Sequence, residues 1–307
     1  MKIVFMGTPV FAVKSLEVCL SLGEVVAVVT QPDKPRGRGQ EVSFSPVKEL
    51  AVARGIPVLQ PLKIKGTNFA DELRALSAEV GVVTAYGKLL PQDVLDAPRR
   101  GCVNVHASLL PRFRGAAPIQ WAIAAGEEKT GVCLMRMDAG MDTGPVIDRA
   151  ELPIEPDDTS ATLHDKLSAL GGEVLGRSLL RYVAGELQPV PQPTQGVVMA
   201  PMIKKEDGHL DWSKTARELE RRLRAFTPWP GAFCTFDGAL LKVSKASVGT
   251  RQGAPGTVLV AAPEGVVVAC AEGSLTLLSL QPQGKRAMTA REFLASRTLV
   301  VGSSPFS

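Results

Sequence analysis

Apolar residues follow two different spacings in the first part of this chain, and each spacing predicts one kind of element. Short apolar runs rich in β-branched residues are typical of buried strands, and they lie at Lys2–Met6, Val25–Thr30 and Val80–Ala85. Apolar residues at helical spacing lie between these runs, at Phe11–Leu22, Ser45–Arg54 and Phe69–Glu79. Buried strands that alternate with amphipathic helices predict a parallel sheet with helices on both faces, which is a Rossmann-like α/β fold.

The same spacings continue to about residue 185 and then stop. They predict a helix at Ala117–Gly126, a strand at Val132–Met137 and a long amphipathic helix from Thr159 to Gly185. The next segment, Leu187–Pro201, has prolines at 189, 191 and 193 and almost no charge, and this composition predicts an extended linker. We therefore expect a Rossmann-like catalytic domain at residues 1–189 and a linker at 190–206.

Many short strands are predicted beyond the linker. A helix is expected at Thr215–Phe226, and short apolar runs separated by glycine-containing turns follow it, at Ala232–Phe236, Leu240–Ala246, Gly256–Ala261, Gly265–Ala269 and Ser274–Leu280. Several short strands at this spacing are typical of a small β-barrel. The sequence therefore predicts an OB-like barrel domain at residues 207–307.

The composition is that of an ordinary globular protein, with 45% hydrophobic and 21% charged residues. No apolar run approaches the roughly 20 residues that a membrane helix needs, and the N-terminus does not resemble a signal peptide. The five cysteines are scattered without a Cys-x-x-Cys pair, and only three histidines are present. We therefore expect a cytoplasmic protein with reduced thiols, no metal site and no contact with a membrane.

Charge is distributed unevenly between the two halves. Residues 1–189 contain 21 Lys and Arg against 22 Asp and Glu, whereas residues 190–307 contain 14 against 9. The segment Gln31–Gln40 combines prolines, glycines and the cations Lys34, Arg36 and Arg38, which predicts an irregular surface loop able to contact phosphates. The helix near 215–226 carries Arg217, Arg221 and Arg224 on its polar side. These cations favour a nucleic-acid partner, and a basic solvated surface without a partner is the alternative.

The chemistry of the chain is predicted at Asn104–Pro118, where an apolar strand ends in polar residues. On a strand, Asn104, His106 and Ser108 share a face. An amide donor beside a group that titrates near neutral pH is suited to hold an oxyanion and to transfer a proton, although such a pair can also simply cap a strand. The first turn, Gly7-Thr8-Pro9, lacks the Gly-x-Gly-x-x-Gly pattern, which disfavours a dinucleotide cofactor and a nicotinamide dehydrogenase.

Two motifs resemble the signature of the folate-dependent formyltransferases, which use 10-formyltetrahydrofolate as the formyl donor. The first is Asn-x-His-x-Ser-Leu-Leu-Pro from Asn104, with Arg114-Gly115 and Pro118, and the second is Asp138–Pro145. In that family the Asn, the His and the second Asp form the catalytic triad, which implies Asn104, His106 and Asp142 here. The resemblance implies that Asn104 and His106 stabilise an oxyanion and that Asp142 orients His106 and favours its charged form.

The resemblance also implies where the folate donor binds. In the family the pocket is lined by a turn after a buried strand and by residues after the catalytic His. These fall here on Tyr86, Gly87, Leu89, Ser108, Leu109, Leu110 and Pro111. Both stretches follow predicted strands, at the carboxyl edge where α/β sheets bind ligands. Simple chain reversal is the alternative for each short turn.

The loop 31–40 with Ser45–Lys48 resembles the tRNA-contacting loop of the family members that act on initiator methionyl-tRNA. Further matches are Asp207–Trp212, Arg224–Gly231 and Leu280–Lys285. The resemblance implies formyl transfer to the methionine amino group of initiator tRNA for translation initiation. An enzyme that uses both domains on one tRNA can work as a monomer, which is the state we expect. The alternatives are a formyltransferase of the same core acting on an amino sugar nucleotide or another small amine, and a nucleic-acid-binding protein without catalysis.

Overall fold

The computed structural model describes residues 1–36 and 41–307. Contacts within the chain define two compact units. The first unit comprises Met1–Pro118, Lys129–Pro153 and His164–Pro201, and the second comprises Ile119–Glu128, Ile154–Leu163 and Met202–Ser307. Among the helices of the described residues, none has both the length and the apolar character that crossing a membrane requires.

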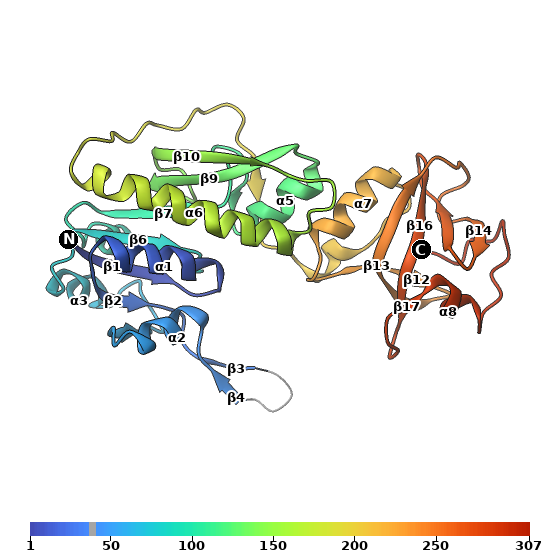
Figure 1. Cartoon of the computed structure of the whole chain (residues 1–307), viewed down its shortest axis with the longest axis horizontal. Helices are drawn as coiled ribbons and strands as arrows, with labels where there is room; N and C mark the ends of the chain where they lie inside the picture. Colours follow the sequence, from blue (N-terminus) through green and yellow to red (C-terminus); the bar gives the residue numbers. More distant parts are fainter. Residues whose placement is uncertain (37–40) are drawn as a thin grey trace. The chain divides into compact units, whose positions relative to one another are not determined.

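A seven-stranded sheet forms the centre of the first unit (Figure 1). Its order is β10 (Val146–Pro153), β9 (Lys129–Arg136), β7 (Cys102–His106), β6 (Val80–Thr84), β1 (Lys2–Gly7), β2 (Glu24–Val29) and β5 (Val58–Leu59). The strands from β7 to β5 are parallel, which confirms the Rossmann-like prediction. β9 runs antiparallel to β7, and the edge strand β10 runs antiparallel to β9, which the sequence did not predict. Since the chain order reverses between β1 and β6, the carboxyl ends of these strands mark the expected ligand crevice.

Helices α1 (Phe11–Leu22), α2 (Pro46–Ala53), α3 (Phe69–Ala75), α4 (Gln92–Leu95), α5 (Pro118–Ala125) and α6 (Ser160–Val183) complete the elements before residue 190. Alternate strand residues face opposite sides of the sheet, and Val4 and Met6 pack with Phe69 of α3. The helix α6 lies beside α1 (Figure 1). It approaches the sheet closely at Gly171, where an added Cβ would lie 2.9 Å from Val105 Cγ1. Val105 alternates with Asn104 and His106, so α6 covers the face opposite these two polar residues.

The prediction of an irregular loop at residues 31–40 is wrong for residues 34–36, which form a strand. The strands β3 (Lys34–Arg36) and β4 (Glu41–Ser43) form an antiparallel ladder of their own. A ladder of two strands leaves one edge of each strand unpaired, and Pro35, which has no N–H to donate, can occupy such an edge strand. Two further short strands, β8 (Arg114–Gly115) and β11 (Met199–Ala200), form a parallel pair.

The second unit contains an antiparallel sheet of the strands β12 (Ala232–Phe236), β13 (Ala239–Gly249), β16 (Ser274–Pro282), β15 (Gly265–Ala269) and β14 (Val258–Ala262), and β17 (Met288–Thr289) pairs with β16. This sheet confirms the small β-rich domain, although its end strands β12 and β14 do not pair with each other in the described residues. The helix α7 (Ala216–Ala225) begins with a capping box between Thr215 and Glu218 and buries Leu219 and Leu223 in the core. A 3₁₀ turn, η1 (Lys205–Gly208), and α8 (Ala290–Leu294) were not predicted.

Candidate active site and RNA-binding surfaces

Strand β7 positions Asn104 and His106 at its carboxyl end. It is bonded on one side to β6 and on the other to β9, so its backbone is held on both edges. Asn104 is half-buried, and the His106 side chain is 6% exposed. Ser108 lies beyond the end of the strand, is fully buried, and its Oγ donates to the carbonyl of Arg112 at 2.6 Å. The structure therefore brings two of the three predicted polar residues to one strand end and uses the third to shape the following loop.

The Asp142 carboxylate lies against these two side chains. Its Oδ1 is 3.5 Å from Asn104 Nδ2 and 3.6 Å from His106 Nδ1. Its Oδ2 accepts a 2.8 Å hydrogen bond from the backbone N–H of Gly115. Asp142 adopts a left-handed backbone conformation with φ of 53°, which is unusual for a residue with a Cβ. The three residues predicted to form a triad thus lie together, with one carboxylate oxygen of Asp142 between Asn104 Nδ2 and His106 Nδ1.

The other ring nitrogen of His106 defines the tautomer. Nε2 lies 3.0 Å from the carbonyl oxygen of Phe113. Because a carbonyl oxygen can only accept, Nε2 carries a hydrogen and the ring is oriented with Nδ1 toward Asp142, so Nδ1 can donate only when the ring is protonated on both nitrogens.

Gln192 completes the support of the Asp142 loop, and the sequence did not identify it. Its Nε2 donates to the carbonyls of Asp142 and Gly144 at 2.8 and 2.7 Å. Its Oε1 accepts from Nε and Nη2 of Arg114 at 3.1 and 2.7 Å. The only signal in the sequence was an amide between two prolines, Pro191 and Pro193, in a segment whose composition is otherwise that of a linker.

The predicted folate residues divide into buried and exposed positions. Tyr86 is 2% exposed, and burial raises the pKa of its hydroxyl to about 12. Its carbonyl accepts from Thr8 Oγ1 at 3.2 Å and from Gln31 Nε2 at 3.0 Å, so the side chain and carbonyl shape the turn from inside. Leu89 is 73% exposed, and Gly87 has φ of 83°.

The second predicted folate stretch follows directly after β7. Leu110 packs with Cys133 and Met135, and the Leu110–Pro111 bond is cis. The Leu109 side chain lies against Gly131. A folate role for both stretches, Tyr86 to Leu89 and Ser108 to Pro111, stays a prediction.

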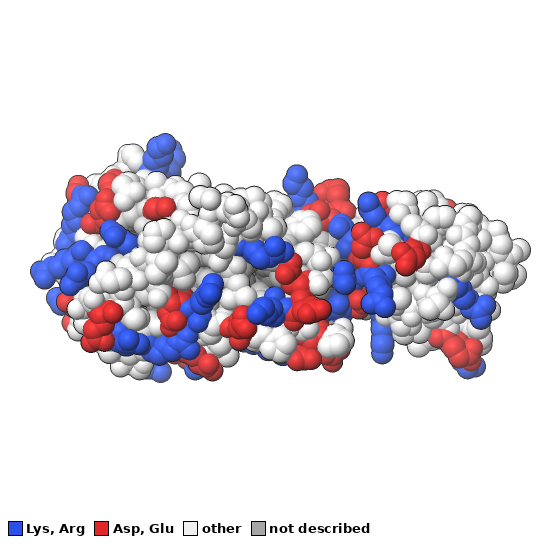
Figure 2. All heavy atoms as spheres, turned by 90° about the horizontal axis from the view of Figure 1, so that it is seen from above, with Lys and Arg blue, Asp and Glu red and all other residues white. Residues whose placement is uncertain are grey.

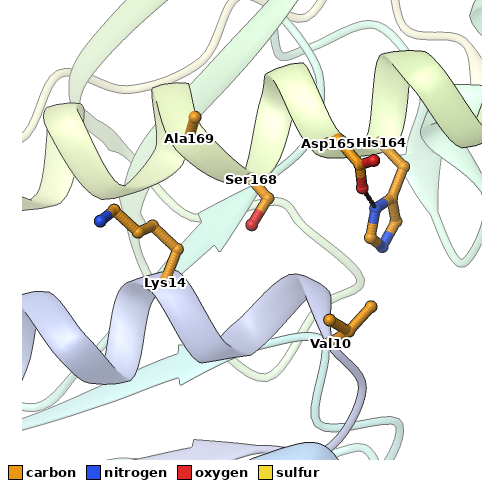
Figure 3. Close-up of a pocket in the computed structure, with 6 residues that line it drawn as sticks. All are labelled: Val10, Lys14, His164, Asp165, Ser168 and Ala169. Carbon is orange, nitrogen blue, oxygen red and sulfur yellow. Dashed lines mark hydrogen bonds and ion pairs between the residues drawn. The ribbon is translucent and has the colours of Figure 1, made fainter.

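A separate hollow of about 230 Å³ lies between α1 and α6, away from the triad residues (Figure 3). It is lined by Val10, Lys14, His164, Asp165, Ser168 and Ala169. His164 Nδ1 lies 2.9 Å from Asp165 Oδ1, and its ring meets the edge of Phe11 with centroids 5.2 Å apart. Ser168 Oγ donates to the Phe11 carbonyl at 3.0 Å. These contacts join two helices, so His164 has a structural role here.

The base of the β3–β4 hairpin is anchored by a polar network. Asp33 forms an ion pair with Lys48, and Gln60 Nε2 donates to Asp33 Oδ1 at 3.0 Å and to the Gln31 carbonyl at 2.9 Å. Hydrogen bonds from Lys48 and Gln60 hold the pKa of Asp33 below its usual range. The backbones of Lys34 and Arg36 lie in β3, and Arg38 lies outside the described residues. The hairpin therefore starts from a fixed base.

Helix α7 places three predicted tRNA-binding arginines on one hollow of about 640 Å³, together with the end of β13 at residues 246–249. Arg217 is exposed, whereas Arg224 donates to Glu220 Oε1 at 2.6 Å and to the Asp158 carbonyl at 2.9 Å. The Arg221 guanidinium lies against Gly126. Basic and acidic side chains are interspersed over much of the face drawn in Figure 2.

Comparison with known families defines the class of protein. Residues 1–179 match the model of the formyl transferases, and residues 202–298 match that of the formyl transferase C-terminal domain. The chain therefore belongs to the formyl transferase family, as the two motifs predicted. Among its relatives it is 63% identical over 305 residues to the methionyl-tRNA formyltransferase of Myxococcus xanthus, covering 99% of this chain and 98% of that protein. It is 49% identical to the methionyl-tRNA formyltransferase of Caldanaerobacter subterraneus, covering 99% of both.

Solved structures share the fold at much lower identity. An N-formyltransferase from Helicobacter canadensis, in complex with folinic acid and dTDP-3-aminofucose, matches 92% of this chain and 99% of its own with a TM-score of 0.70 and 19% identity. HypX from Aquifex aeolicus, in complex with tetrahydrofolic acid, matches 96% of this chain with a TM-score of 0.62 and 18% identity. The chain spans about half of HypX, 47% of its length. Within the described residues, no group of three or more His, Cys, Asp or Glu side chains is arranged to hold a metal ion.

Proposed function

We propose that this protein transfers the formyl group of 10-formyltetrahydrofolate to the amino group of methionine on initiator methionyl-tRNA, preparing it for translation initiation. The observation that carries the proposal is the convergence of two donors, Asn104 Nδ2 and His106 Nδ1, on one carboxylate oxygen of Asp142 at 3.5 and 3.6 Å. Neither distance is that of a tight hydrogen bond, so the Asn104 amide and the Nδ1–H of an imidazolium at His106 remain available to a substrate oxygen.

In this mechanism the neutral methionine amine attacks the formyl carbon. A C–N bond forms, and the π electron pair of the carbonyl moves to its oxygen. The Asn104 amide and an imidazolium at His106 donate to that oxyanion, and Asp142 holds the ring in place. The oxyanion then collapses, the bond from carbon to the folate nitrogen breaks, the folate nitrogen gains a proton and the new amide nitrogen loses one. Atoms and charge balance without a metal ion.

The choice of acceptor follows from the relatives and from the cations. The chain is 63% identical to a methionyl-tRNA formyltransferase but 19% identical to the sugar-nucleotide enzyme of similar fold. Cations on the hairpin near Lys34 and Arg36 and on α7 at Arg217 and Arg221 belong to separate units. A small amine does not need cations spread over two units, whereas a long phosphate backbone does. We further propose a cytoplasmic monomer, with residues 1–189 as catalytic domain and 207–307 as RNA-binding domain.

The test is formylation of three acceptors with the same folate donor. The acceptors are methionyl initiator tRNA, free methionine and an amino sugar nucleotide. We expect the charged tRNA alone to be formylated efficiently. Formylation of the sugar nucleotide but not of tRNA would support the catalytic role of the triad and reject tRNA as the acceptor. Formylation of none of the three acceptors would reject the catalytic role of the triad.

A further inference from the structure

The segment from Val190 to Ala200, which we name the strap, is hydrogen-bonded beside both loops of the proposed catalytic site, the loop after β7 and the loop that carries Asp142. Val190 and Val146 exchange two backbone hydrogen bonds of 2.8 Å at the start of β10. At its other end the strap pairs as β11 with β8, and the Arg114 N–H donates to the Val198 carbonyl at 2.9 Å. The strap therefore contacts the loop after β7 and the loop that carries Asp142.

Gln192 lies in the strap between these two anchoring points. Its amide N–H₂ group donates hydrogen bonds to two backbone carbonyls of the Asp142 loop, those of Asp142 itself and of Gly144. Both hydrogens are used, so the group restrains the orientation as well as the position of this loop. Asp142 has φ of 53°, a backbone conformation that costs free energy for a non-glycine residue, and the two hydrogen bonds from Gln192 help to stabilise it.

Arg114 determines which way the Gln192 amide faces. The guanidinium donates from both Nε and Nη2 to Gln192 Oε1. Since an arginine can only donate, the oxygen of the amide must face Arg114 and its N–H₂ group must face the Asp142 loop. Residue 115, directly after Arg114, donates to Asp142 Oδ2. Its glycine lets the strap approach closely, because a Cβ there would lie 2.6 Å from the Ala200 carbonyl.

We propose that Gln192 is a positioning residue for catalysis, which holds the Asp142 carboxylate against Asn104 and His106 and is itself oriented by Arg114. Gln192 acts through Asp142 and does not touch the reacting atoms. This inference rests on the catalytic role proposed for Asp142.

The decisive substitution is Gln192→Glu, which keeps the shape and the acceptor for Arg114. It replaces the amide N–H₂ group by a carboxylate oxygen, which cannot donate to the carbonyls of Asp142 and Gly144. Because a displacement of about 1 Å can cost roughly 100-fold in rate, we expect kcat to fall about 10- to 100-fold while KM for the folate donor and for tRNA changes less than about threefold. Gln188→Glu is the matched control, since Gln188 is exposed and donates to the nearby Gly185 carbonyl at 2.9 Å. It should keep the wild-type kcat.

A double-substitution cycle separates positioning from a general structural role. In an Asp142→Ala background, Gln192→Glu should cost no further activity, because the group it positions is gone. If Gln192→Glu lowers the activity of the Asp142→Ala protein by the same factor as that of the wild type, the inference is rejected. A large rise in KM for the folate donor at unchanged kcat in the Gln192→Glu protein would also reject it. A fully active Asp142→Ala protein would instead reject the catalytic role proposed for Asp142, and with it the basis of this inference. A strongly impaired Asp142→Ala protein together with a fully active Gln192→Glu protein would overturn this inference alone.

Discussion

At the scale of single residues, the site consists of two donors and one carboxylate whose atoms meet at 3.5 to 3.6 Å. His106 is held by β7 and by the Phe113 carbonyl, whereas Asp142 is held by backbone and by Gln192. The sequence predicted Asn104, His106 and Asp142 because they stand at the matching positions of two family motifs. It did not predict Gln192, because that residue lies 50 positions from Asp142 and bonds a backbone carbonyl, which every residue possesses.

Alanine at Asn104, His106 or Asp142 should each lower kcat by about 100-fold or more, because each removes a group aimed at the developing oxyanion or its support. Single-turnover formylation with saturating folate donor and methionyl-tRNA measures this rate. The losses should be far from additive in the Asn104→Ala, Asp142→Ala double variant. Asn68→Ala, at an exposed asparagine before α3, serves as control. A triple variant with near wild-type kcat would remove all three from the mechanism.

Tyr86→Phe should raise the free energy of unfolding by about 1 kcal/mol, because the buried Tyr86 hydroxyl has no hydrogen-bond partner among the described residues. Urea denaturation of the two proteins measures the difference. KM for the folate donor should not change, since the ring packs in the core with Leu73 and Val94. A KM raised tenfold in the Phe variant would show that the hydroxyl reaches the donor after all.

At the scale of elements, the positions of most helices and strands in the first unit followed from the two apolar spacings. The direction of β9, the edge strand β10 and the β3–β4 ladder did not. Strand direction is determined by how the chain returns to the sheet, and local periodicity carries no information about it. A two-residue strand such as β8 or β11 is too short to show any spacing at all.

Two glycines of α6 should respond to alanine in opposite directions. At Gly171 the new Cβ would lie 2.9 Å from Val105 Cγ1, so Gly171→Ala should lower the free energy of unfolding by about 1 to 3 kcal/mol. At Gly176 the nearest atom is Val18 Cγ1 at 3.6 Å, so Gly176→Ala should gain about 0.5 to 1 kcal/mol from helix propensity. Thermal unfolding of the pair tests this, and equal effects of the same sign would show that α6 does not pack closely on the sheet.

At the scale of the whole molecule, the cations proposed to bind RNA belong to two units. Two linked weak binding surfaces raise affinity together, so removal of either surface weakens binding and removal of both weakens it further. The arginines of α7 are unequal in this respect. Arg224 is engaged with Glu220 and with the Asp158 carbonyl, and its side chain is 16% exposed, whereas Arg217 is exposed.

Alanine at Lys34, Arg36 and Arg38 together should weaken tRNA binding and reduce the slope of log affinity against log salt by roughly 0.7 to 0.9 for each phosphate that is no longer neutralised. Salt titrations of binding, with kcat measured at saturating tRNA, distinguish this from a catalytic effect. An unchanged slope would place the hairpin away from the RNA.

Arg217→Ala should likewise raise KM for tRNA at unchanged kcat. Arg224→Ala should mainly lower the melting temperature, because it leaves Glu220 and a backbone carbonyl without their partner. The reverse pattern, with Arg217→Ala affecting stability and Arg224→Ala affecting only tRNA, would contradict the difference in their surroundings.

The strap also determines where this enzyme can be divided. A chain shortened at residue 189 would end three residues before Gln192 and would lack β11, the partner of β8. A chain shortened after Pro201 would retain every contact described for the Asp142 loop. Anyone who grafts this catalytic unit onto a different RNA-binding or sugar-binding module should therefore join the two after Pro201, so that the strap is transplanted with the loops that it contacts.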